Sequence, residues 1–139
     1  MVEGWFKDEY LILFERGEVP TASERYFIER WLPGYEVIGL RSWDDLFIRN
    51  SAGQVFSAPC VPLSADYMSP VATLPRADAL SSDTRHSGQI KWYVQPLVFA
   101  GSPTDSSNVQ WVSHEHHGQL VVWWNERYLQ LKTQGATGA

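Results

Sequence analysis

Residues 114–117, His-Glu-His-His, contain three imidazoles and one carboxylate, which are side chains that bind zinc. On a helix, His114 and His117 are three positions apart and share a face, whereas His116 points away from them. The HExxH pattern of zinc enzymes needs histidines four positions apart, and that spacing is absent. The geometry favours a structural role, with Glu115 at a helix start and His117 at the margin of the core. Zinc on His114 and His117 stays the weaker alternative.

Cys60 is the only cysteine, so the chain cannot build a disulfide scaffold. A catalytic thiol would need a base, which His86 or the histidines of 114–117 could supply if folding brought them close. A lone cysteine is more often a small buried apolar residue, and we favour that interpretation. The sequence also lacks the Gly-x-Ser-x-Gly pattern of hydrolases and the glycine-rich loops that hold phosphates. We therefore expect no enzymatic activity and no cofactor.

Asp44 and Asp45 are adjacent carboxylates beside the large aromatic Trp43. Aspartate is common in turns and caps, so one carboxylate could cap the next segment while the other faces water. In a second interpretation the pair forms a compact negative patch that binds a protein partner. The candidate partner-binding residues are Trp43, Asp44, Asp45, Asp66, Asp78 and Asp83.

The seven tryptophans fall into two groups according to their predicted burial. Those on predicted inward faces are Trp31, Trp92 and Trp124. Those less well placed for burial are Trp5, Trp43, Trp111 and Trp123. Because tryptophan is enriched among the residues that dominate protein interfaces, the surplus favours a protein-binding face.

The composition narrows the class of protein. A chain of 139 residues is most simply one domain, and its aromatic content excludes disorder as a description of the whole chain. The net charge of −5 disfavours a nucleic-acid partner, because affinity for phosphate comes largely from Lys and Arg. No apolar run is long enough to span a membrane, and the first residues do not resemble a signal peptide. We expect a cytoplasmic protein with no membrane partner and leave its oligomeric state open. The alternatives to a binding protein are a small metal- or ligand-dependent enzyme that uses the His114–His117 cluster and a scaffolding protein that forms homo-oligomers through its exposed tryptophans.

Apolar spacing predicts a helix at residues 5–16. Thr21 and Glu24 match a capping box for a second helix that ends at Leu32, because Pro33 excludes the helical conformation before it. Strands are predicted at 35–40, 46–49, 54–57, 89–95 and 108–112, with a hairpin turn at 50–53. A helix is predicted at 113–131, before a frayed tail at 133–139.

The segment 58–88 is rich in proline and small polar residues, and it predicts a long irregular loop with one short turn near residues 66–68. Helices at the two ends of a run of strands indicate an α+β fold. We expect a central, mainly antiparallel sheet with N-terminal helices and a long C-terminal helix packed on it.

Three stretches together resemble small bacterial proteins encoded beside secreted toxins, the SUKH superfamily of immunity proteins. They are residues 32–47, residues 88–103 and residues 108–128. The resemblance lies in their texture and in the placement of their aromatic residues. It implies a non-enzymatic protein that neutralises one cognate toxin in the cytoplasm, often by covering the active site of the toxin. An acidic surface would steer a basic toxin toward the encounter.

Overall fold

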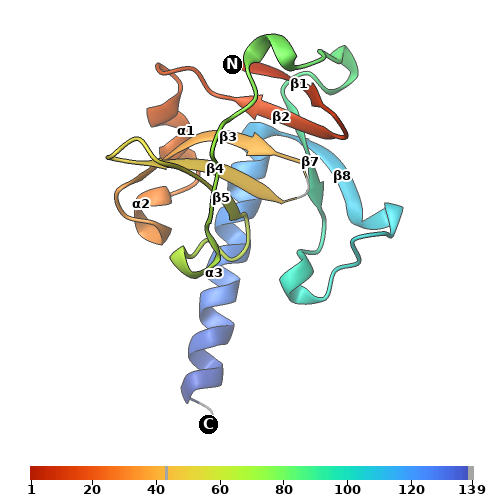
Figure 1. Cartoon of the computed structure of the whole chain (residues 1–139). Helices are drawn as coiled ribbons and strands as arrows, with labels where there is room; N and C mark the ends of the chain where they lie inside the picture. The colour runs from red at the N-terminus through yellow and green to blue at the C-terminus, as the bar shows by residue number, and fades with distance from the viewer. Residues whose placement is uncertain (43, 138–139) are drawn as a thin grey trace.

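The computed structural model describes residues 1–42 and 44–137, with side chains up to residue 133. Within these residues, the main sheet has six antiparallel strands that follow one another in sequence order (Figure 1). The strands are β1 (Val2–Phe6), β2 (Glu9–Leu13), β3 (Tyr35–Arg41), β4 (Asp45–Asn50), β5 (Val55–Pro59) and β6 (Ser69–Pro70). A second sheet pairs β7 (Gln89–Tyr93) with β8 (Val109–Ser113).

Two short helices, α1 (Val19–Arg25) and α2 (Ile28–Trp31), connect β2 to β3, and the long α3 (His114–Thr137) follows β8. In Figure 1 the first part of α3 lies behind the main sheet, and its last turns extend beyond both sheets. The predicted α+β class is confirmed. Among the described helices, none combines the length and the apolar character needed to cross a membrane.

The larger core lies between one face of the main sheet and the helices, and Tyr10, Ile12 and Val121 are among its fully buried members. A smaller cluster covers the other face of the sheet. It contains Leu11, Val19, Ile38 and Phe47, with Leu74 and Leu80 packed against them. Successive residues of β2 therefore belong to different clusters, and this strand is buried on both faces.

The helix predicted at residues 5–16 is wrong, because these residues belong to the antiparallel β1–β2 hairpin. Lys7 and Asp8 form the turn, and Lys7 has a φ of 57°. Since both faces of β2 are covered, its apolar residues run continuously and do not alternate with polar ones. Such a run cannot be distinguished from a buried helix by its periodicity alone.

The second predicted helix is present, but it is broken into α1 and α2. Helix α1 begins after Glu18 with no side-chain cap, so the expected capping box of Thr21 and Glu24 does not form. Phe27 lies between the two helices in the left-handed conformation, with φ 50° and ψ 42°. This break lets Tyr26 and Ile28 both point into the core, whereas residues two apart on one helix lie about 200° apart.

Several local predictions are confirmed. Strands β4 and β5 form the expected hairpin, in which Asn50 Oδ1 accepts hydrogen bonds from the backbone N–H groups of Ala52 and Gln54. Strands β3, β7 and β8 also lie where strands are predicted. Residues Leu97–Phe99, between β7 and β8, form the short 3-10 helix η4.

The segment expected to be irregular, 58–88, contains β6 and three 3-10 turns. They are η1 (Ala65–Tyr67), η2 (Ala77–Ala79) and η3 (Thr84–His86). Helix α3 continues to Thr137, past its predicted end at residue 131, so the tail expected to fray is helical as far as Thr137. Residues 138–139 lie outside the described residues.

Helix α3 approaches α1 closely at Gly118. A Cβ at this position would overlap Cγ of Arg25, whose aliphatic stem crosses α3 here. The Arg25 guanidinium then donates a hydrogen bond to Nδ1 of His114 at 3.0 Å. Glycine inside a helix costs about 1 kcal/mol relative to alanine, and this close crossing accounts for it.

The variant Lys7→Gly tests whether residues 5–13 form the observed hairpin or the helix that the sequence predicts. In the hairpin it should raise the free energy of unfolding by roughly 0.5–1 kcal/mol, because the left-handed conformation costs a residue with a Cβ more than it costs glycine. In a helix the same change would cost about 1 kcal/mol. Chemical denaturation measures the difference. Asp8→Gly is the control. Because Asp8 does not have a positive φ, glycine relieves no strain there and should destabilise the protein through its larger loss of backbone entropy on folding.

Candidate functional site

The histidines of residues 114–117 do not gather into one site. His117 is buried, with Nδ1 2.6 Å from the Tyr26 hydroxyl and Nε2 3.9 Å from Cys60 Sγ. Burial lowers the pKa of His117 to about 3, helped by the neighbouring histidines, so the ring is neutral. His114 faces Arg25 instead. No group of three potential metal ligands lies together within the described part of the chain.

Folding does bring Cys60 to a histidine, but in the interior of the core. Burial raises the pKa of the Cys60 thiol well above its usual range, and the charges of Asp44 and Asp45 add to this effect. Reactive cysteines have lowered pKa values and partly exposed, electropositive surroundings. The contact between Cys60 and His117 has neither property, so its geometry is that of core packing.

Cys60 should therefore be unreactive in the folded protein. Iodoacetamide at neutral pH should label no cysteine in native protein and one cysteine in guanidinium, as measured by mass spectrometry. Rapid labelling of the native protein would instead indicate an accessible thiolate.

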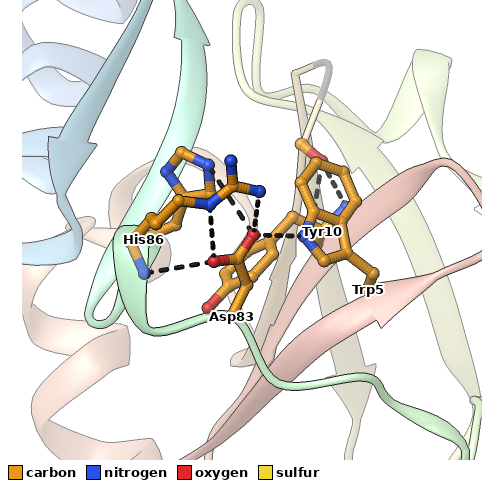
Figure 2. A network of polar contacts seen from close by, with 6 residues as sticks. Trp5, Tyr10, Asp83 and His86 are labelled. Atoms are coloured by element: carbon orange, nitrogen blue, oxygen red, sulfur yellow. Dashed lines mark hydrogen bonds and ion pairs between the residues drawn. The ribbon is translucent and has the colours of Figure 1, made fainter.

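The second potential base, His86, lies elsewhere, in a cluster at the edge of β1. Its ring stacks on Trp111 with 3.6 Å between ring centroids, and its Nε2 is 4.0 Å from the Asp83 carboxylate. Asp83 also accepts a hydrogen bond from Trp5 Nε1 at 3.0 Å. Figure 2 shows Asp83 between His86 and Trp5. Since Trp5 and Ser81 also pair through their backbones, this cluster fastens the irregular segment to β1.

The five candidate carboxylates have different surroundings. Asp45 is ion-paired with Arg41, Asp78 with Arg76, and Asp83 with Arg85. Asp66 is exposed in η1, which lies far from η2 in Figure 1. Trp43, the aromatic member of the predicted set, lies outside the described residues. The set is therefore dispersed and largely paired, and it does not form one negative patch.

Asp44, predicted as a contact for a partner, is buried. Its Oδ1 has no hydrogen-bond partner, and its backbone has a φ of 88°. Burial, together with the nearby Asp45 carboxylate, raises the pKa of the Asp44 carboxyl to about 8. The side chain is therefore protonated at neutral pH. Burial beside β7 and Cys60 is a tertiary property that neighbouring residues in the sequence do not reveal.

Asp44 should make the protein less stable as pH rises. In the unfolded chain it loses its proton near pH 4, whereas the folded protein holds that proton to about pH 8, so the Asp44 contribution to stability falls across this interval. The lowered pKa of His117 has the opposite effect below about pH 6.5, so the net fall in stability is expected between about pH 6.5 and pH 8. Asp44→Asn should remove this slope and stabilise the protein at pH 8 by more than about 1 kcal/mol relative to wild type. Urea denaturation at a series of pH values measures the effect. Asp66→Asn, at an exposed position, should keep the wild-type slope.

Two large aromatic side chains are exposed near the junction of α1, α2 and α3. Phe27 is 56% exposed and Trp123 is 58% exposed. The Trp123 ring packs edge-on against Trp124, with 4.8 Å between ring centroids, and Trp124 in turn packs against Phe99. The Trp123 ring is therefore held in place by Trp124 on one side, while its other side is exposed to solvent.

Phe27 separates two hollows that are open to solvent. The α3 hollow has a volume of about 930 Å³ and lies between α1 and residues of α3 that include Val122 and Trp123. The α2 hollow has a volume of about 560 Å³ and lies between α1, α2 and the start of β3. Both are lined by Phe27 and Glu24. We call Phe27, Trp123 and the two hollows the Phe27–Trp123 face.

The sequence partly indicates this face. Trp123 is among the tryptophans predicted to be poorly placed for burial, whereas Phe27 is assigned to a continuous helix and missed. The run Tyr26-Phe27-Ile28 carries a signal, because three adjacent bulky residues cannot all face one side of a helix. Which residue turns outward depends on the left-handed break.

Comparisons of the chain with protein-family models, with curated proteins and with solved structures give no significant match.

Proposed function

We propose that the protein is a non-enzymatic binding protein that holds a partner protein on the Phe27–Trp123 face. The observation that carries the proposal is the conformation and exposure of Phe27. A bulky side chain at positive φ is an outlier, and the left-handed conformation costs an L-residue roughly 1–2 kcal/mol. Glycine would remove that strain and would also remove an exposed ring.

Stability therefore does not account for a phenylalanine at position 27, whereas recognition does. Strained residues that persist in a well-packed structure cluster at functional sites. Large exposed aromatics near hollows are also the side chains that dominate protein interfaces. Trp123 supplies a second such side chain on the same face.

The partner that we propose is a secreted bacterial toxin, which the protein neutralises in the cytoplasm by covering its active site. This identity rests on the resemblance to SUKH immunity proteins. The net charge of −5 supports a basic toxin, because opposite charges accelerate the encounter of two proteins. The dispersed carboxylates would contribute to this long-range attraction without forming the contact surface.

The variant Phe27→Gly tests the proposal. It should lose no more than about 0.5 kcal/mol of unfolding free energy, because relief of strain offsets the lost packing of the ring. Its affinity for the toxin encoded beside this gene should fall at least about tenfold. Calorimetry measures the affinity, and survival of cells that express the toxin measures neutralisation.

Lys7→Gly is the matched control, because it relieves the same backbone strain in the β1–β2 turn. It should bind the toxin and protect cells as the wild type does. Full protection by Phe27→Gly, or a neighbouring gene product without toxicity, would contradict the proposal.

A further inference from the structure

The two hollows of the Phe27–Trp123 face differ in charge. Glu24, Glu29 and Glu36 line the α2 hollow. Glu36 is ion-paired with Arg49, so Glu24 and Glu29 supply the negative charge of this hollow. The guanidinium that lines it belongs to Arg30, which forms an ion pair with Glu126 of α3. The α2 hollow thus carries an excess of negative charge.

The α3 hollow is lined by equal numbers of acidic and basic residues. Its lining contains two acidic residues, Glu24 and Glu126, and two basic residues, Arg25 and Arg127. Trp123 supplies the large exposed surface of this hollow, beside Val122. An apolar side chain placed here would cover the Trp123 ring without leaving an unmatched charge.

Phe27 and Glu24 line both hollows, so one continuous segment can enter both. A cationic side chain over the α2 hollow would meet the carboxylates of Glu24 and Glu29 at a partly apolar surface, where Ile28 and Tyr35 also contribute. An acidic segment or a nucleic-acid backbone would be repelled there.

We propose that the Phe27–Trp123 face binds a single segment of the partner that carries a large apolar residue against Trp123 and a Lys or Arg against Glu24 and Glu29. This inference rests on the proposed function, because it assigns the chemistry of the same face. The inference also fixes the orientation of the bound segment, because its apolar residue lies toward α3 and its basic residue toward α2.

Selection from a random-peptide phage library on the full-length protein tests the inference without the toxin. The selected peptides should share an aromatic or aliphatic residue close to a Lys or Arg. In calorimetry with the best synthetic peptide, Trp123→Ala should weaken binding at least about tenfold. The double change Glu24→Gln and Glu29→Gln should weaken it by about tenfold and flatten its salt dependence.

Asp66→Asn is the matched control, because it removes an exposed carboxylate that lines neither hollow and should leave the peptide affinity at the wild-type value. Circular dichroism confirms that each variant folds. Peptides without basic residues, or peptides that bind the Glu24/Glu29 variant as tightly as the wild type, would overturn the inference. A wild-type dimer that Phe27→Gly dissociates would also overturn it, because the face would then hold a second copy of the chain.

The two proposals fail separately. In one outcome, protection from the toxin depends on Phe27 but the selected peptides lack the expected pattern. This result would support the binding function and refute the proposed chemistry of the segment. In the other outcome, peptides with a basic and an apolar residue bind the face, but the protein does not protect cells from the toxin. This result would support the proposed chemistry of the segment and refute the toxin as the partner.

Discussion

The buried polar contacts of α3 determine how the helix is oriented on the rest of the fold. The Tyr26 hydroxyl meets His117 at 2.6 Å. The Asn125 amide donates to the carbonyl of Cys60 and accepts from the N–H of Leu63, each at 2.7 Å. An unpaired polar group at either buried position would cost about 1–3 kcal/mol. These bonds therefore tie α3 both to α1 and to the segment after β5.

That orientation places Trp123 outside. His117, Val121 and Asn125 recur every four residues and face the core. Trp123 is two residues from both Val121 and Asn125, so it lies about 200° around the helix from each. On α1 and α2 the same requirement acts through Tyr26 and Ile28, whose burial leaves Phe27 facing solvent at a left-handed break. Trp123 and Phe27 are thus exposed because their neighbours in the sequence are buried in the core.

Phe27 and Asp44 are both strained residues, but their surroundings differ. Asp44 combines a φ of 88° with a buried carboxyl that is protonated at neutral pH. Phe27 combines its strain with exposure and with two hollows. Strain at an accessible surface favours recognition. At Asp44 it is the raised pKa of the buried carboxyl that makes stability depend on pH.

Local chemistry in the sequence was enough to predict the β4–β5 hairpin, the break at Pro33 and the start of α3, because each depends on residues close together in the chain. Composition and order were enough for the α+β class. Only the tertiary structure decided that β2 is a strand covered on both faces and that Asp44 is buried. It also decided that Cys60 meets His117 and that Phe27 turns outward. These properties depend on contacts between residues far apart in sequence, and the periodicity of one segment does not record what covers its second face.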